Sequence, residues 1–321
     1  MVRVRKQNDR FGRAQGTSLL GNVIPVLAVE DDHGLQLSPY TGLGESFYSL
    51  GARWDATLRL PERLRAATTG ADVSERVANG VRTVVAATPQ ARDFALAVGP
   101  LKVRTTRVRG IRIRAFAKDA RVTRGALRFA RRAVAKFSSR FGPYGSTELD
   151  VVVVRMRYSG MEYPELVFTE PFGVATTHEV AHQWWYGIVG DDQYREPWLD
   201  ESFATYSHEW LHPSANFCDP DRPYSLVERP HRQIALDSSM AVFDRAPPFA
   251  IGEVIYSAGS CALQRLERDI GRTRMTAFLR LLQSRFRFGV MRTTDVLDAI
   301  HAAAPAYRVR RWARLAHLSV R

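Results

Sequence analysis

The sequence predicts an α+β fold, in which a β-rich N-terminal part precedes a mainly helical part. Alternating and β-branched runs separated by turn residues dominate roughly the first 112 residues. After about residue 113, apolar residues recur instead at helical spacing. This change of pattern places a domain boundary near residue 115, between domains 1–115 and 116–321.

In the N-terminal part, three runs have the character of β-strands. They are Ala52–Leu60, Arg82–Ala87 and Val103–Phe116. Turn residues such as Pro61 and Gly80 separate them, so we expect short connections between these strands.

The C-terminal part begins with a predicted helix in which apolar residues recur from Ala126 to Phe141. Gly142-Pro143 ends that helix, and Leu149–Met156 is a β-branched run that predicts a buried strand. The other predicted helices are Thr177–Ile188, Asp200–Leu211, Ile251–Ile270, Thr273–Phe286 and Thr293–Ala303.

The charge of the chain is strongly positive overall and negative in one segment. The net charge is +13, and 42 of the 46 basic residues are Arg, mostly scattered. The basic clusters Arg104–Arg114 and Arg308–Arg314 lack interleaved aromatic residues, so we predict no nucleic-acid partner. By contrast, Ser159–Glu201 has nine acidic residues and one Arg, which suits a site for cations.

The sequence predicts no transmembrane segment, because no apolar run approaches the roughly 18 residues that a membrane-spanning helix needs. Basic Met1–Arg13 precedes apolar Ser18–Val29, but Gly21, Asn22 and Pro25 interrupt the apolar stretch. The pattern is not a convincing signal peptide, so the chain as it stands is predicted to be cytoplasmic. Export stays open if the N-terminus is truncated.

Cys218 and Cys261 are the two cysteines, and neither lies in a CxxC or other metal-ligand spacing. We expect two free, partly buried thiols. A single disulfide stays open as the alternative for an exported protein.

The strongest chemical signal is the string His178-Glu179-Val180-Ala181-His182. Residues four apart on a helix share one face, so both imidazoles can reach a single metal ion. Neutral imidazole is a good zinc ligand, and Glu179 lies near the same face, where it can accept a proton from water. We therefore predict one Zn²⁺ per chain, with His178 and His182 as ligands and Glu179 as the general base.

A catalytic zinc site has three protein ligands and one open position. Glu201 follows His182 after eighteen intervening residues, and Gly187, Gly190 and Pro197 allow the chain to turn back between two helices. We predict Glu201 as the third metal ligand.

These strings resemble the aminopeptidase N family of zinc metallopeptidases. HEVAHQWW and WLDESFA, with their gap of eighteen residues, match the central motifs of that family. Gly160-Met161-Glu162-Tyr163-Pro164 resembles its GxMEN element, and Tyr256-Ser257-Ala258-Gly259 resembles its YxKG segment. With a weaker match over 21–48, the resemblance extends from about residue 20 to about residue 315.

The resemblance implies roles for individual residues. Glu162, with Gly160 and Met161, would bind the substrate and its free α-amino group, and Tyr256 would donate a hydrogen bond to the developing oxyanion. Gln15 is the candidate for a second amine-binding residue.

The resemblance also implies a partial N-terminal β domain followed by a thermolysin-like catalytic domain, in a shortened member of the family. This chain departs from the family pattern at Tyr163, where the motif has Asn, and at Ser257-Ala258, where the motif has Lys. These differences concern the substrate subsites rather than the metal ligands.

The function that the resemblance implies is release of N-terminal amino acids from peptides with a free N-terminus. Two alternatives stay open. One is a zinc endopeptidase, which would not need Glu162 to bind an amine. The other is a truncated, non-catalytic relative that acts as a binding protein.

Overall fold

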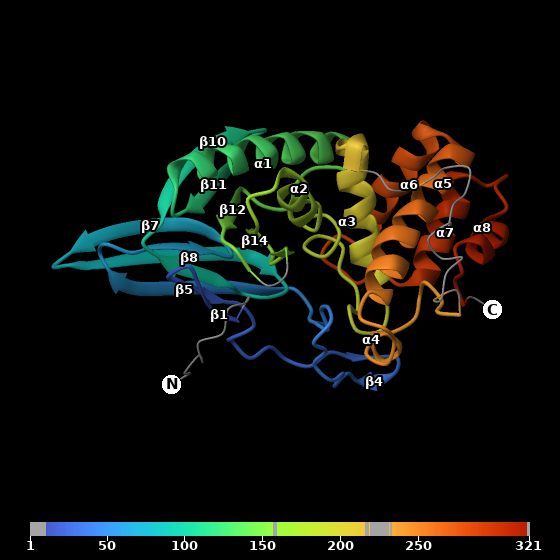
Figure 1. Ribbon diagram of the computed structural model, residues 1–321, viewed down its shortest axis with the longest axis horizontal. Helices are drawn as coiled ribbons and strands as arrows, with labels where there is room; N and C mark the ends of the chain where they lie inside the picture. Colours follow the sequence, from blue (N-terminus) through green and yellow to red (C-terminus); the bar gives the residue numbers. More distant parts are fainter. Residues whose placement is uncertain (1–10, 157–158, 216–217, 219–230, 232, 320–321) are drawn as a thin grey trace. The chain divides into compact units, whose positions relative to one another are not determined.

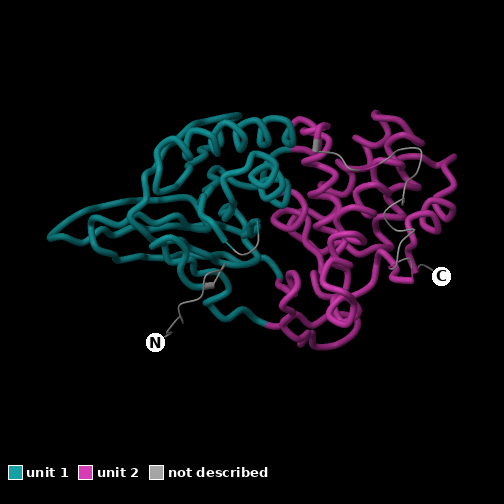
Figure 2. Tube along the Cα trace, viewed as in Figure 1, with its two compact units in different colours: residues 1–27, 50–138, 143–183 teal, residues 28–49, 139–142, 184–321 magenta. Residues whose placement is uncertain are grey.

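The computed structural model describes residues 11–156, 159–215, 218, 231 and 233–319 (Figure 1). The chain divides into two compact units (Figure 2). Unit 1 comprises residues 1–27, 50–138 and 143–183, and unit 2 comprises residues 28–49, 139–142 and 184–321. Each unit therefore draws on separate stretches of the sequence.

Unit 1 contains two antiparallel sheets built from the N-terminal part of the chain. One has the strand order β1-β2-β9-β6, formed by Phe11–Ala14, Thr17–Leu20, Leu96–Gly99 and Arg65–Thr68. The other has the order β5-β8-β7, formed by Ala52–Pro61, Val81–Ala91 and Ala71–Ala78.

A five-stranded mixed sheet with the order β10-β11-β12-β14-β13 completes unit 1. Its strands are Lys102–Val108, Ile111–Ala117, Glu148–Val153, Leu166–Thr169 and Gly160–Met161. Strands β11, β12 and β14 are parallel, and helix α1 (Ala120–Arg140) makes the crossover that a parallel β11–β12 pair requires (Figure 1). Every residue of β12 is buried, whereas β13 lies at the edge of the sheet. Helix α2 (Gly173–Ala181) follows β14 in the chain.

Unit 2 is mainly helical. Its elements are the short β3–β4 pair (Glu30–Asp31 and Gly34–Leu35), α3 (Trp198–Leu211), η1 (Pro213–Ala215), α4 (Met240–Phe243), the π-helical η2 (Gly252–Ala258), α5 (Gly259–Ile270), α6 (Arg272–Arg285), α7 (Thr293–Ala303) and α8 (Val309–Leu315). Large aromatic side chains fill its core, and Phe203 packs against Trp185 with ring centroids 4.6 Å apart. Trp312 of α8 donates a hydrogen bond to the carbonyl of Ala262 on α5, at 2.9 Å.

The predicted α+β class is confirmed, because a β-rich N-terminal region precedes a mainly helical one. The prediction of one strand over Val103–Phe116 is wrong. Arg109 and Gly110, with φ of 51° and 83°, form a turn that separates β10 from β11. The predicted strand Leu149–Met156 is shorter than expected and ends at Val153. The domain division at residue 115 stays a proposal.

The helix predicted over Thr177–Ile188 is wrong at both ends. It begins at Gly173 and ends at Ala181. Beyond it the chain makes a tight turn, in which the Tyr186 amide donates to the Val189 carbonyl at 2.8 Å. The φ of Tyr186 is 141°, which a continuing α-helix excludes.

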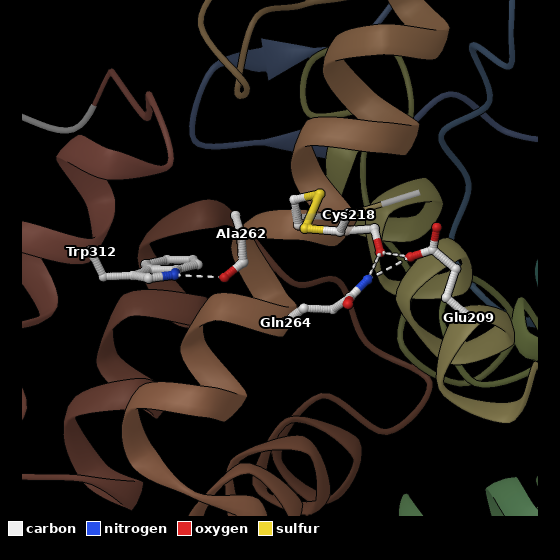
Figure 3. The surroundings of a disulfide bond; sticks show 7 residues. Glu209, Cys218, Ala262, Gln264 and Trp312 are labelled. Carbon is white, nitrogen blue, oxygen red and sulfur yellow. Dashed lines mark hydrogen bonds between the residues drawn. A yellow bond between two sulfur atoms is a disulfide. The ribbon is translucent and has the colours of Figure 1, made fainter. Parts of the chain in front are cut away.

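The expectation of free thiols is also wrong, because Cys218 and Cys261 form a disulfide (Figure 3). Their Cα atoms lie 5.4 Å apart, which is within the usual range for a disulfide. Cys261 lies on α5, next to Ser260, whose hydroxyl donates to the Glu209 carboxylate of α3. Gln264 also donates to that carboxylate, at 2.7 Å (Figure 3). The pairing depends on a contact 43 residues apart in the sequence, which spacing alone does not reveal.

Within the described residues, no helix combines the length and the apolar character that crossing a membrane would require.

Asp93 is a buried carboxylate of unit 1 with an exposed fraction of 3%. It accepts hydrogen bonds from the side chain of Asn22 at 2.7 Å and from the amide of Phe94 at 2.6 Å. Burial nevertheless dominates and raises the pKa of Asp93 to about 6.

We predict that Asp93 makes unit 1 less stable as pH rises from about 4 to about 6. The folded state holds the Asp93 proton more tightly than the unfolded state, so the unfolding free energy falls across this window, by about 3 kcal/mol. Chemical denaturation at several pH values should show a flatter profile for Asp93→Asn than for the wild type. Equal slopes in the two proteins would contradict the assignment, and Asp55→Asn, a change at an exposed carboxylate, is the control.

We predict that reducing the Cys218–Cys261 disulfide lowers the unfolding free energy by about 2–4 kcal/mol, because the bond closes a loop of 43 residues in the unfolded chain. Denaturation with and without reductant measures the loss. The double variant Cys218→Ala/Cys261→Ala should be insensitive to reductant. Two free thiols in the native, oxidised protein would disprove the pairing.

Candidate metal centre

Helix α2 and the residue after it present the two predicted histidine ligands. His182 follows the last residue of α2 with helical dihedrals, so His178 and His182 keep the i, i+4 relation. Their Nε2 atoms lie 3.1 Å apart, and their rings meet edge to face at 81°. His182 is 1% exposed, whereas His178 is partly exposed. One imidazole is thus open to an incoming group.

This pair of nitrogens fits a zinc ion. Zn–N bonds of about 2.0–2.1 Å in tetrahedral geometry separate two ligand nitrogens by about 3.3 Å, close to the distance seen here. Two neutral imidazoles whose Nε2 atoms both act as acceptors would repel each other at this distance. A proton on one ring or a shared cation removes that conflict, so the spacing is compatible with two ligands of one zinc ion.

Two buried carboxylates lie beside His182. Glu162 and Glu179 are 3% and 4% exposed, and ligand-type atoms of Glu162, Glu179 and His182 all lie within 4.8 Å of one another. The predicted base and the predicted amine-binding residue therefore share one cluster in unit 1.

Gly160 brings the edge strand β13 against the Glu179 carboxylate. A Cβ atom at position 160 would lie 2.0 Å from Oε1 of Glu179, so only glycine allows this approach. Met161, the next residue, is fully buried. It pairs with Phe168 of β14, so β13 leads the chain directly into Glu162.

Gln183 holds the end of α2 against the loop that follows β13. Its Oε1 accepts hydrogen bonds from the amide of Glu165 at 2.7 Å and from the hydroxyl of Tyr144 at 3.2 Å. Its Nε2 donates to the carbonyl of Tyr163 at 3.1 Å. Burial raises the pKa of Tyr144, which keeps its hydroxyl protonated as a donor. Burial likewise raises the pKa of Glu165 to about 7, although Thr88 donates to that carboxylate.

Tyr163, which stands where the family motif has Asn, contacts the N-terminal part of unit 1. The ring is fully buried, and its hydroxyl donates to Oδ1 of Asn22 at 2.9 Å. A Cβ atom at Gly21 would lie 1.6 Å from the Tyr163 hydroxyl oxygen. The larger side chain is thus accommodated by the absence of one at position 21.

Unit 2 carries the other two predicted functional residues. Glu201 lies in the first turn of α3, near the positive end of the helix dipole, and is 7% exposed. Tyr256 lies on η2, and its hydroxyl donates to Oε1 of Glu201 at 2.6 Å. The chain is helical over the predicted Ile251–Ile270, but Gly252–Ala258 is π-helical rather than α-helical.

Glu45 is a residue that sequence reasoning missed. In unit 2 it lines a small hollow together with Glu201, Tyr256 and Gln193, and carboxylate oxygens of Glu45 and Glu201 lie within 4.8 Å. No local motif marks Glu45, because its place depends on the fold of the whole segment 28–49. Gln15, the candidate amine-binding residue, accepts a hydrogen bond from the Arg155 amide at 3.1 Å within unit 1. Its role in binding an amine stays a prediction from the sequence.

The structure thus brings together His178, His182, Glu179 and Glu162 in unit 1, and Glu201 and Tyr256 in unit 2. The three-ligand set draws on both units and stays a prediction from the sequence.

Curated relatives of this chain are aminopeptidases. It is 24% identical over 188 residues to leucine aminopeptidase 2 of Yarrowia lipolytica, and 26% identical over 180 residues to human aminopeptidase B. Each match covers 49% of this chain and 28% of the relative, so the chain matches less than a third of those proteins.

A solved structure shares the fold. The M1 zinc metallopeptidase of Deinococcus radiodurans has a TM-score of 0.66 and 22% sequence identity, over 84% of this chain and 64% of that protein. The model of the peptidase family M1 domain matches residues 126–312, which is more than half of the chain. The family relationship implies a catalytic zinc ion and confirms the resemblance drawn from the motifs. This chain belongs to peptidase family M1.

Proposed function

We propose that this chain is a zinc-dependent aminopeptidase, which releases N-terminal amino acids from peptides with a free N-terminus. The observation that carries the proposal is the pair of His178 and His182 Nε2 atoms 3.1 Å apart, with two buried carboxylates in the same cluster. Such a cluster combines a metal-binding pair, a candidate base and a candidate amine-binding group.

The proposed metal ligands are His178, His182 and Glu201, with one Zn²⁺ per chain. Two imidazoles and one carboxylate are a ligand set that catalytic zinc sites use. When bound, zinc polarises the scissile carbonyl and makes water a stronger nucleophile near neutral pH.

Glu179 is the proposed general base. Its carboxylate accepts the proton of the attacking water and then gives that proton to the nitrogen of the leaving peptide. The contact with Gly160 limits the positions that this carboxylate can adopt, because the backbone of β13 packs against it. A base held in this way loses little entropy when the reaction begins.

Tyr256 is the proposed donor to the developing oxyanion. Its hydroxyl already donates to Glu201, so the O–H lies beside the proposed ligand before substrate arrives. We propose that this O–H changes partner in the transition state, where a donor aimed at new negative charge has its largest effect.

Glu162 is the proposed binding group for the substrate's ammonium. It directly follows β13, which is the edge strand of its sheet. A peptide can pair with such an edge through backbone hydrogen bonds, which fixes its register. A buried carboxylate at the end of that edge would pair with the free amine, so that the first peptide bond is the one that reacts. The aminopeptidase names of the curated relatives support this specificity.

We predict that the wild type binds about one zinc ion per chain. The zinc content of His182→Ala should be far lower, because one imidazole and one carboxylate form an incomplete site. Metal analysis of dialysed protein measures the content. His301→Ala, which removes an exposed histidine of α7, should bind zinc like the wild type. Zinc retained at wild-type level by His182→Ala would exclude this ligand set.

We predict that Glu179→Gln keeps its zinc but lowers kcat by roughly 10²–10⁴-fold, because an amide preserves the shape of the side chain and accepts no proton. Steady-state kinetics with a panel of aminoacyl fluorogenic substrates measures the effect. Glu75→Gln, at a distant partly exposed carboxylate of β7, is the matched control. A nearly normal kcat would show that another group is the base.

We predict that acetylating the substrate's N-terminus lowers kcat/KM by about 10²-fold or more, because the acetylated end offers the buried Glu162 carboxylate no ammonium to bind. Glu162→Ala should weaken cleavage of free-amine substrates and narrow the gap to acetylated ones. If the wild type cleaves both kinds of peptide equally well, the exopeptidase assignment fails and an endopeptidase takes its place.

A further inference from the structure

The segment that carries Tyr256 has an unusual helical geometry. In η2, the amide of Gly259 donates to the carbonyl of Val254, five residues earlier, before α5 continues as a regular helix. π-Helical turns are rare because their geometry is less favourable, and they occur often at functional sites. Contacts from outside the segment must therefore stabilise this one.

Ser202 of α3 supplies one such contact. Its hydroxyl donates to the carbonyl of Ile255 at 2.7 Å, and both residues are fully buried. Ser202 directly follows Glu201, and Ile255 directly precedes Tyr256. Two successive residues of α3 therefore bond to two successive residues of η2.

Gly259 allows α3 and this segment to approach so closely. A Cβ atom at position 259 would lie 1.9 Å from the Ser202 hydroxyl oxygen and 2.7 Å from its Cβ. Both atoms belong to a buried side chain that is held by its hydrogen bond to Ile255. The glycine thus leaves the space that the Ser202 side chain occupies.

We propose that Ser202 and Gly259 form a positioning pair that sets the place of the Tyr256 hydroxyl beside Glu201. Ser202 fixes the carbonyl that precedes Tyr256, and Gly259 permits the contact. The pair acts through Tyr256 and touches no substrate. The tests that measure turnover rest on the proposed aminopeptidase function. The tests that measure stability and amide exchange do not depend on it.

The first test is a double-mutant cycle on kcat. Ser202→Ala should lower kcat by roughly 10–100-fold with KM changed less than about threefold, because the displaced hydroxyl matters mainly in the transition state. In the Tyr256→Phe background, the same change should lower kcat less than about twofold. Zinc content should stay near one per chain in all four proteins.

Ser207→Ala is the matched control, because Ser207 is another fully buried serine of α3 that bonds to Trp185 and Phe203 instead. Its effect on kcat should be small and the same in both backgrounds. If Ser202→Ala lowers kcat by the same factor in the wild type and in the Tyr256→Phe background, the two residues act independently. Ser202 then does not act through Tyr256, and the proposal is overturned.

The second test does not need turnover. Gly259→Ala should lower Tm by about 3–6 °C, because the new methyl group overpacks against the Ser202 side chain. The double variant Ser202→Gly/Gly259→Ala lacks that side chain, so its Tm should lie within about 2 °C of the Tm of Ser202→Gly alone. The double variant should keep a low kcat, since it lacks the hydroxyl. Amide exchange over Gly252–Gly259 should rise in Ser202→Ala and not in Ser207→Ala.

These measurements separate the two hypotheses. A wild type that carries zinc but cleaves no peptide would refute the proposed function, while Tm and amide exchange would still decide the positioning pair. A Gly259→Ala protein with unchanged Tm, or unchanged exchange in Ser202→Ala, would overturn the pair while leaving the function standing.

Discussion

Within unit 1, the carboxamide of Gln183 bonds to three groups that are distant from it in the sequence, and the candidate site depends on these bonds. The side-chain oxygen accepts hydrogen bonds from the Glu165 amide and the Tyr144 hydroxyl, and the side-chain nitrogen donates one to the Tyr163 carbonyl. Because Gln183 follows His182, the end of α2, where the two candidate metal ligands lie, is joined to the loop that carries Glu162. A buried amide satisfied at both ends tolerates little displacement, since moving it would leave polar groups unpaired.

Unit 2 achieves a similar result by other means. Glu201 and Tyr256 are held by helix-to-helix contacts rather than by one side-chain amide, and the close approach at Gly259 permits them. Each unit thus orders its own chemical groups through contacts made within that unit. Order of this kind lowers the entropy lost when a substrate or metal binds.

Local spacing explains which features were predictable. The close approach of the His178 and His182 rings depends on helix geometry alone, so the sequence was sufficient to predict it. The role of Glu179 as base stays a proposal. The end of α2 at Ala181, the π-helical turn before Gly259 and the disulfide at Cys261 depend on contacts with remote segments. The same holds for Glu45, which lies near Glu201 only because of how residues 28–49 fold. Propensity and periodicity carry no information about such contacts.

The contact between Tyr163 and Gly21 links two positions 142 residues apart in the sequence. No side chain can replace the hydrogen of Gly21 while the phenol occupies its present place, and the Asn22 amide is oriented to receive that phenol. The two positions are therefore expected to vary together among relatives of this chain. Relatives with Tyr at the second position should keep glycine at the first, whereas relatives with the shorter Asn are free to carry larger residues there. Covariation between the N-terminal β region and the substrate-binding loop would then trace a steric dependence rather than a shared chemical role.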